Sequence, residues 1–178
     1  VMVIRRELGM SLPNQGHYFN AGTLHKRFTP AGPDHAQVAA CAGMADYVDA
    51  VYAHHYKPKA SPAVRASHVH DLFRDHEKLL AQPILDYLSA KNSVQLVGPA
   101  SAESRAPTIA LKLQISGEEA AKKLVPFGVM AGGGDFYAVR PLAAMRISPE
   151  HGVLRLSFVH YTAQEDIDRL LNGLDHVL

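Results

Sequence analysis

The sequence has little of several features that would assign it to a compartment or to a class of partner. Its 178 residues include a single cysteine, Cys41, which cannot form a disulfide within the chain and fits a reducing compartment. No apolar run approaches the roughly 18 residues that span a bilayer, and the first residues lack the basic, apolar and small-residue regions of a signal peptide. We therefore expect a cytoplasmic chain without membrane contact.

Net charge is also small. The formal charge is +1 at pH 7, and the Lys and Arg residues are scattered along the chain rather than gathered in a stripe. Because nucleic-acid binding depends on concentrated positive charge, there is no electrostatic reason to expect that partner. Hydrophobic residues make up 47% of the chain and charged residues 20%, which indicates a folded globular protein.

The first third of the chain combines a short apolar run with a long irregular segment. Residues 1–8 (VMVIRREL) predict a strand, and residues 9–33, rich in Gly, Pro and Asn, predict a long loop of the kind that serves a site or an interface. The turn at 31–33 leads into a predicted helix that runs to about His55. Prolines in 56–62 interrupt the helical pattern and predict a boundary there.

The remainder alternates between helical and strand patterns. A long amphipathic helix is predicted over 63–90, and Pro83 should kink or divide it. The elements that follow are a strand at 94–97, a strand at 108–115, a helix capped by Ser116 and Glu119, a strand from Val129, a short helix at 141–145, a strand at 153–159 and a helix capped by Thr162 and Glu165. This order predicts an α/β chain whose second part is a small α+β domain, with a mostly antiparallel sheet covered by helices on one face.

The strand at 153–159 carries a charge at its centre. Leu154, Leu156 and Phe158 lie on one side of the strand, and Arg155 lies on the other. An arginine in this position must reach solvent, a carboxylate or a ligand. The pattern alone permits an ordinary surface ion pair as well as a ligand site.

Eleven histidines raise the question of a metal site. The densest groups are His54 with His55, and His68 with His70 and His76. These residues lie on both sides of the predicted boundary, on helices where adjacent or i,i+2 side chains diverge, whereas a metal needs three or four converging ligands. We therefore predict no metal site and expect solvated or helix-end histidines.

Two further groups could carry chemistry. Residues 132–135 (GGGD) could cradle an anion or form a flexible turn, but they lack the spacing of a dinucleotide site or a P-loop. Lys26 follows His25 and could be a Schiff-base nucleophile. Because Arg27 follows and the loop is polar, nothing would desolvate this lysine, and a surface basic residue is the better interpretation.

Four segments keep a common order along almost the whole chain. They are RFTPAGPDH (27–35), RAPTIAL (105–111), GVMAGGGDFYAVRPL (128–142) and GVLRLSFVHYTAQEDIDRLL (152–171). Together they resemble the C-terminal part of class V aminotransferases, and more narrowly the cysteine desulfurase-like branch of the fold-type I pyridoxal-phosphate enzymes. The last segment is the most specific, because that family carries an R-x-S-F-x-x-Y-[NT] strand followed by an acidic-capped terminal helix.

The resemblance implies roles for four residues. Arg155 would hold the α-carboxylate of an amino-acid substrate, a task suited to the two parallel N–H groups of a guanidinium, and Tyr137 would line the substrate mouth. Ala31 and Gly32 would lie at a homodimer interface and reach the phosphate of the partner subunit's pyridoxal 5′-phosphate through backbone N–H groups. Gly32 stands where many members have a threonine.

The resemblance also implies what the chain does not contain. The family's Schiff-base lysine belongs to an S-x-x-K-x-x-G-P motif that we expect upstream of Val1, so no catalytic residue is assigned. Many desulfurases carry a catalytic cysteine in the loop that corresponds to 132–141, and this loop has none, which excludes persulfide chemistry by that route.

Residues 1–56 are accordingly expected to be the remnant of a large cofactor-binding domain, and residues 57–178 the small C-terminal domain. The parent protein would be a pyridoxal-phosphate-dependent transferase, and the chain alone is expected to be catalytically silent. Transamination, desulfuration and elimination all remain open, as does the substrate. The competing hypothesis is a stand-alone, non-catalytic binding domain; an upstream reading frame that encodes the lysine motif would favour the enzyme.

Overall fold

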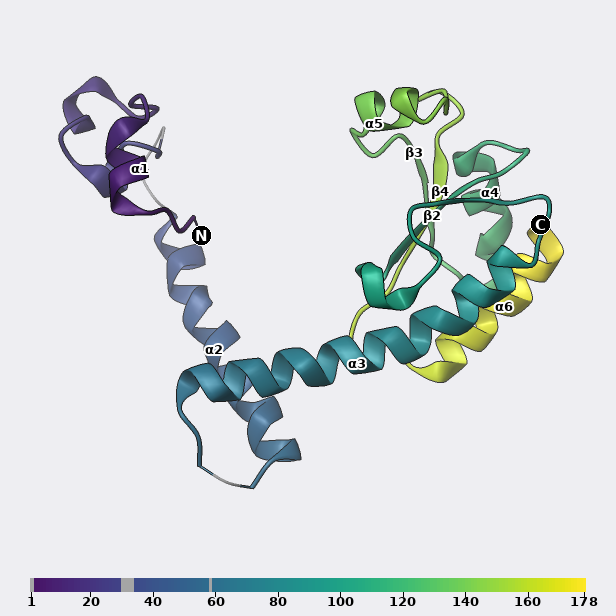
Figure 1. The fold of residues 1–178 in the computed structure, drawn as a ribbon, viewed down its shortest axis with the longest axis horizontal. Helices are drawn as coiled ribbons and strands as arrows, with labels where there is room; N and C mark the ends of the chain where they lie inside the picture. The colour runs from purple at the N-terminus through teal and green to yellow at the C-terminus, as the bar shows by residue number, and fades with distance from the viewer. Residues whose placement is uncertain (1, 30–33, 58) are drawn as a thin grey trace. The chain divides into compact units, whose positions relative to one another are not determined.

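The computed structural model describes residues 2–29, 34–57 and 59–178, and it divides the chain into two compact units, Val1–Val69 and His70–Leu178 (Figure 1). We call them the N-terminal and the C-terminal unit. The helix α3 (Pro62–Ser89) belongs to both. The predicted break between helices at 56–62 is confirmed, while the assignment of residues 1–56 and 57–178 to separate domains stays a prediction.

The N-terminal unit begins with a helix rather than a strand. Residues Arg6–Ser11 form α1, and two 3₁₀ turns, η1 (Tyr18–Asn20) and η2 (Leu24–Lys26), follow within the long loop. The prediction of a strand at 1–8 is therefore wrong. Every strand found among the described residues lies in the C-terminal unit, so an extended segment at this end would leave its backbone groups without a partner strand.

The second helix of this unit was predicted correctly. It is α2 (His35–His55), and Asp34 caps its start, because Oδ1 of this residue accepts hydrogen bonds from the backbone N–H of Ala36 at 3.0 Å and of Gln37 at 3.1 Å. The turn before it, with Ala31 and Gly32, lies outside the described residues.

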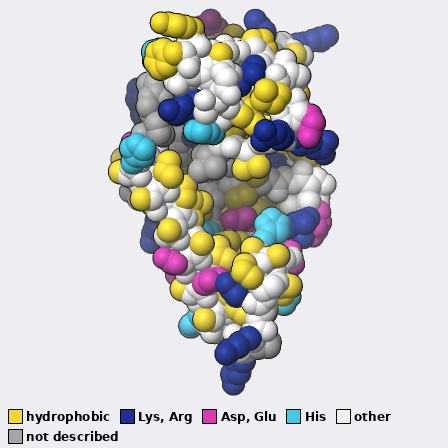
Figure 2. Space-filling view, turned by 90° about the vertical axis from the view of Figure 1, so that its left-hand side faces the viewer, with side chains coloured by type: hydrophobic (Ala, Val, Ile, Leu, Met, Phe, Trp, Pro, Cys, Tyr) yellow, Lys and Arg dark blue, Asp and Glu magenta, His cyan; other side chains and the backbone are white. Residues whose placement is uncertain are grey.

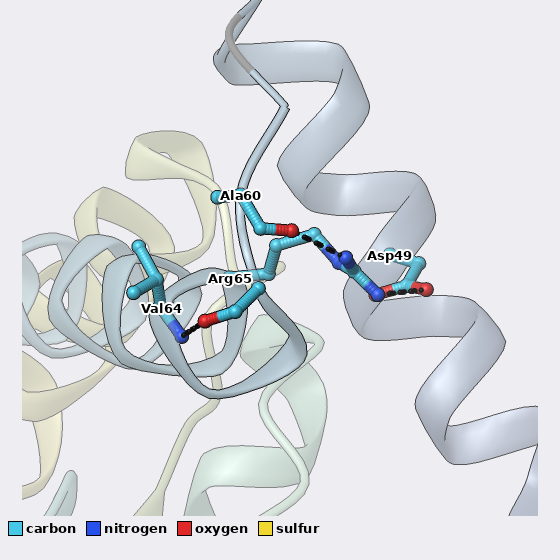
Figure 3. A network of polar contacts seen from close by, with 5 residues as sticks. Asp49, Ala60, Val64 and Arg65 are labelled. Carbon is cyan, nitrogen blue, oxygen red and sulfur yellow. Dashed lines mark hydrogen bonds and ion pairs between the residues drawn. The ribbon is translucent and has the colours of Figure 1, made fainter.

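A polar network ties α2 to the first turns of α3 (Figure 3). The Arg65 guanidinium forms two parallel bonds to the Asp49 carboxylate, from Nε at 2.7 Å and from Nη2 at 2.8 Å, and a third from Nη1 to the Ala60 carbonyl at 2.7 Å. The Ser61 hydroxyl accepts from the Val64 N–H at 3.4 Å. The Ser61 bond satisfies one backbone N–H in the first turn of α3, and the Arg65 bonds link this turn to α2.

The helix α3 runs without interruption through Pro83. We expected this proline to kink or divide the helix, and it does not divide it. Pro83 is exposed, whereas residues on both sides of it, among them Leu80 and Ile84, are buried in the core of the C-terminal unit. Packing on both sides holds the helix together across the missing hydrogen bond.

The C-terminal unit contains a four-stranded sheet in the order β1-β2-β4-β3, and every neighbouring pair is antiparallel. Its strands are β1 (Gln95–Val97), β2 (Thr108–Lys112), β3 (Gly132–Gly134) and β4 (Val153–Ser157). The four strands predicted within this unit are confirmed in position; β2 ends three residues earlier than predicted, at Lys112 rather than Ile115, and β3 begins after Val129.

Helices cover one face of this sheet. Side chains of α3, α4 (Gly117–Leu124) and α6 (Gln164–Val177) pack on the inward residues of β2 and β4, which include Ile109, Leu111 and Leu154. The predicted small α+β architecture is confirmed. A second, smaller cluster forms where α5 (Val139–Ala144) adjoins the sheet, and it comprises Leu142, Ile147 and Val153. Two further 3₁₀ turns are η3 (Ala102–Ser104) and η4 (Val125–Phe127).

The two predicted helix caps differ in outcome. The Ser116 hydroxyl accepts from the Glu119 N–H at 3.2 Å and starts α4, as predicted. The predicted pair of Thr162 and Glu165 is wrong: the Thr162 hydroxyl accepts from the Val159 N–H at 3.1 Å, and α6 begins later, at Gln164. The side chain that reaches back is Asp166, which accepts from the backbone N–H of residue 163 at 3.1 Å.

Charged side chains are dispersed on one face of the molecule. On the face that Figure 2 shows, Lys and Arg side chains lie singly or in small groups among hydrophobic, acidic and histidine side chains. Among the described residues, no helix is both long and apolar enough to cross a membrane.

Candidate functional site

Arg155 lies in the middle of β4, on the face opposite the main core. The register places it directly across from Gly132 on β3 and from Ala110 on β2. Its neighbours along the strand, Leu154 and Leu156, are buried, and Arg155 is exposed. The alternation predicted from the sequence is confirmed, and it directs the guanidinium away from the helices.

Phe136 is the side chain that meets Arg155. The guanidinium carbon Cζ of Arg155 lies 3.9 Å from the centroid of the Phe136 ring. Within the part of the chain that the structure describes, Arg155 forms no ion pair and no side-chain hydrogen bond. The Phe136 ring thus lies against the guanidinium, whose N–H groups donate no side-chain hydrogen bond among the described residues and could donate to a carboxylate.

The turn that carries Phe136 has unusual backbone geometry. Phe136 has a φ of +50° and Tyr137 a φ of +60°, which are left-handed conformations that side chains other than glycine seldom adopt. The Asp135 carboxylate accepts from the Tyr137 N–H at 3.0 Å, and the Asp135 carbonyl accepts from the Ala138 N–H at 2.8 Å. Strained turns that are fixed in this way occur preferentially at functional sites.

Tyr137 extends into solvent from this turn, and its side chain is fully exposed. Among the described residues it makes no ring contact or side-chain hydrogen bond. Tyr137 follows Phe136 in the chain, but the structure shows no hydrogen bond or ring contact between Tyr137 and Arg155. Its role at a substrate mouth stays a prediction.

Two hydroxyls lie beside Arg155 on the same face of the sheet. Ser157 follows two residues later on β4 and pairs in register with Thr108 on β2. The Thr108 Oγ1 and Ser157 Oγ atoms are 3.3 Å apart. Arg105 supports the start of β2, because its Nη2 donates to the Thr108 carbonyl at 2.8 Å, and burial lowers the pKa of this arginine.

Sequence reasoning missed Phe136. Its apolar side chain in a segment rich in glycine gave no indication of a contact with an arginine 19 residues further along the chain. The alternation of β4 identifies the face of Arg155, but only the pairing of Gly132 with Arg155 shows which loop reaches that face. The glycines at 132–134 indicate a close approach to the backbone, but they do not identify Phe136 or Arg155 as the residues that meet there.

The histidines do not converge. His68 stacks with the ring of Tyr52 at a centroid distance of 5.9 Å and makes a tilted contact with the ring of Tyr56 at 5.1 Å. His76 Nε2 lies 3.1 Å from the Thr162 carbonyl. Over the described ranges, no three His, Cys, Asp or Glu side chains form a group that could hold a metal ion. Lys26 is exposed at the end of η2.

Solved structures of two cysteine desulfurases share the fold of this chain. The enzyme CsdA from Escherichia coli has a TM-score of 0.51 at 21% sequence identity. The match covers 61% of this chain and 26% of that enzyme. The apo enzyme from Thermococcus onnurineus NA1 has a TM-score of 0.52 at 19% identity, with 65% of this chain and 29% of that enzyme covered. The matched part of this chain therefore has the fold of the corresponding part of these two enzymes.

A family model places the chain more narrowly. The model described as Aminotransferase class-V matches residues 66–170, so the chain belongs to the class V aminotransferase family. The aminotransferase-like protein FGM3 of Gibberella zeae is 27% identical over 112 residues, which are 61% of this chain and 28% of that protein. The chain thus spans less than a third of the length of this relative.

The family implies pyridoxal 5′-phosphate as a cofactor. Among the described residues, Arg155 offers N–H groups that could donate to the oxygens of an anion. Lys26, adjacent to Arg27, is exposed and lacks the desolvation that activates a Schiff-base lysine. Residues 31 and 32 lie outside the described part, so no step that involves the cofactor is assigned to this chain.

Proposed function

We propose that this chain supplies the substrate-carboxylate site of a pyridoxal-phosphate-dependent class V transferase that acts on an amino acid. The observation that carries the proposal is the state of Arg155: exposed, held against Phe136, and without an ion pair among the described residues. The structural arginines of the chain use their N–H groups within the protein: Arg65 pairs with the Asp49 carboxylate, and Arg105 donates to a backbone carbonyl. Arg155 instead keeps its N–H groups for a ligand.

The chain's own residues would bind and orient the substrate. Two parallel N–H groups of Arg155 donate to the two oxygens of the α-carboxylate, which fixes the direction in which the α-amino group points. Tyr137, exposed on the adjacent turn, borders the entrance to the site. No described residue is assigned as the lysine that the covalent chemistry requires.

The wider assignment follows from the same family membership. In this proposal residues 1–56 belong to the cofactor domain, Ala31 and Gly32 contact the phosphate across a homodimer interface, and residues 57–178 form the small domain. The protein is proposed to work in the cytoplasm.

A ligand titration tests the carboxylate site. In the ¹⁵N-labelled chain, the Nε–Hε signal of Arg155 should shift with L-alanine and with pyruvate, and it should not shift with L-alaninamide, which has no carboxylate. The Nε–Hε signal of Arg105, which donates to the Thr108 carbonyl, serves as an internal control and should stay in place. Equal shifts with L-alaninamide, or shifts of both arginines alike, would contradict the proposal.

The alternative is a stand-alone binding domain without chemistry, and a second experiment addresses Lys26. The chain is incubated with pyridoxal 5′-phosphate, reduced with borohydride and analysed by mass spectrometry of its peptides. We expect no stoichiometric adduct at Lys26, in line with its exposed position beside Arg27. A specific stoichiometric adduct at this lysine would show that the chain holds its own Schiff-base residue.

A further inference from the structure

We infer that Phe136 is a positioning residue for Arg155, and that Gly132 is required for it to act in this way. The inference rests on the proposed function, since the benefit of a positioned guanidinium lies in carboxylate binding. Its starting point is the distance of 3.9 Å between the Arg155 Cζ atom and the Phe136 ring centroid. The segments that meet in this contact are β3, β4 and the turn between β3 and α5 (Figure 1).

Gly132 makes room for the ring. It pairs with Arg155 across the β3–β4 ladder, so its missing side chain would stand beside the guanidinium on the same face. A Cβ atom at Gly132 would lie 2.9 Å from Cζ and 3.0 Å from Cε1 of Phe136, and 3.9 Å from Nη2 of Arg155. The ring therefore occupies the space that a side chain at this position would fill.

The Phe136 ring is also packed against apolar side chains. Phe136 is partly buried against the small cluster of Leu142, Ile147 and Val153. Its own backbone is fixed in the left-handed region by the Asp135 hydrogen bonds of the turn. A ring that is packed in this way offers a rigid flat surface, on which a guanidinium can stack while its edge stays open.

This arrangement should lower the conformational entropy that Arg155 loses when it binds a carboxylate. A free arginine on a strand surface samples many rotamers, and ordering it on a ligand loses that freedom. Stacking on Phe136 restricts the guanidinium before the ligand arrives. An aromatic residue at 136 should therefore raise the affinity for carboxylates without touching them.

The first measurement needs no ligand and no variant. In the free chain, protons of the Arg155 side chain should show upfield ring-current shifts, and Phe136→Leu should abolish them whereas Phe136→Tyr should retain them. Gly132→Ala, which keeps the ring but displaces it, should reduce them as well. Random-coil shifts for the Arg155 side chain in the unaltered chain would overturn the inference.

The second measurement is the affinity for pyruvate. Phe136→Leu and Gly132→Ala should each weaken binding about threefold, and Phe136→Tyr should bind within about twofold of the unaltered chain. Equal affinity in Phe136→Leu and the unaltered chain would refute the positioning role. If the unaltered chain shows the ring-current shifts but binds no carboxylate, the proposed function fails, and the claim about affinity fails with it, while the stacked geometry stands.

Discussion

The backbones of Gly133 and Gly117 pack so closely that a Cβ atom at Gly133 would come within 2.1 Å of the Gly117 carbonyl oxygen. The contact continues on the other side, since a Cβ at Gly117 would lie 2.2 Å from the Val153 carbonyl oxygen. The first turn of α4 thus rests directly on β3 and β4, without side chains between them. This close approach brings together the strands that carry Gly132 and Arg155.

We expect Gly133→Ala to lower the free energy of unfolding of the C-terminal unit by about 1–3 kcal/mol, because the obstructing atoms are backbone and must move apart. The measurement is a urea titration, followed by the amide signals of residues in that unit.

The matched control is Gly43→Ala in α2. A Cβ there meets nothing within 4 Å, and the position is an exposed helix interior. This substitution should leave the N-terminal unit unchanged or stabilise it by up to about 1 kcal/mol. If Gly133→Ala proves as mild as Gly43→Ala, the close packing of α4 on the sheet is incorrect.

A substitution at Pro83 should instead raise the free energy of unfolding. Pro83 lies exposed inside α3 and supplies no N–H for the carbonyl of Leu79, so Pro83→Ala should add a hydrogen bond and relieve a clash in the middle of the helix. We expect the free energy of unfolding to rise by about 1–3 kcal/mol in urea titrations. A loss of stability would show that the proline ring itself is part of the packing.

Pro83 and the first residues also show where sequence reasoning fails. A proline has a strong local preference, but the buried neighbours Leu80 and Ile84 outweigh it through contacts that no local pattern reveals. The run at 1–8 has the composition of a strand, yet a strand needs a partner, and a short apolar run cannot show whether one exists. In both cases tertiary contacts decide the structure, and a local sequence pattern does not show those contacts.

The C-terminal unit was more predictable, since the alternation in β2 and β4 fixes which residues face the helices. That pattern correctly placed Leu154 inside and Arg155 outside. The site itself was predicted only in part: Arg155 was found by its unusual position and by family resemblance, whereas Phe136 depends on strand register and on a left-handed turn. Neither property can be read from a single sequence.

Asp175 gives a prediction about acid stability. It accepts hydrogen bonds from Tyr87 Oη at 2.6 Å and from Lys91 Nζ at 3.1 Å, and these bonds, the Tyr87 bond first, lower the pKa of Asp175 below 3.8. Because the carboxyl pKa is lower in the folded than in the unfolded chain, its contribution to stability is present above about pH 3.9 and is lost as the pH falls through the folded value. Tyr87→Phe should raise the pKa of Asp175 and reduce the amount of stability that is lost as the pH falls.

The measurements are the carboxyl ¹³C titration of Asp175 and urea midpoints between about pH 2 and pH 6. Tyr161→Phe is the control, since Tyr161 is 78% exposed, contacts the ring of His160 edge-on, and forms no side-chain hydrogen bond with the residues that the structure describes. An Asp175 pKa that is the same in Tyr87→Phe and in the unaltered chain would contradict the assigned cause.

Substitutions at two adjacent residues of β4 should have different effects. The one in the core should lower stability, and the one at the proposed site should abolish carboxylate binding. Leu154 is fully buried, so Leu154→Ala should lower the free energy of unfolding by about 2–5 kcal/mol. Arg155→Leu gives up only the contact with Phe136 and should cost less than about 1 kcal/mol, yet it should abolish the carboxylate-dependent shifts that pyruvate induces in the signals of neighbouring residues. Urea titrations and the pyruvate titration, performed on the same two variants, separate these effects. A large loss of stability in Arg155→Leu would mean that the guanidinium is a structural element, and an Arg155 that is needed for folding could not be kept free for a substrate.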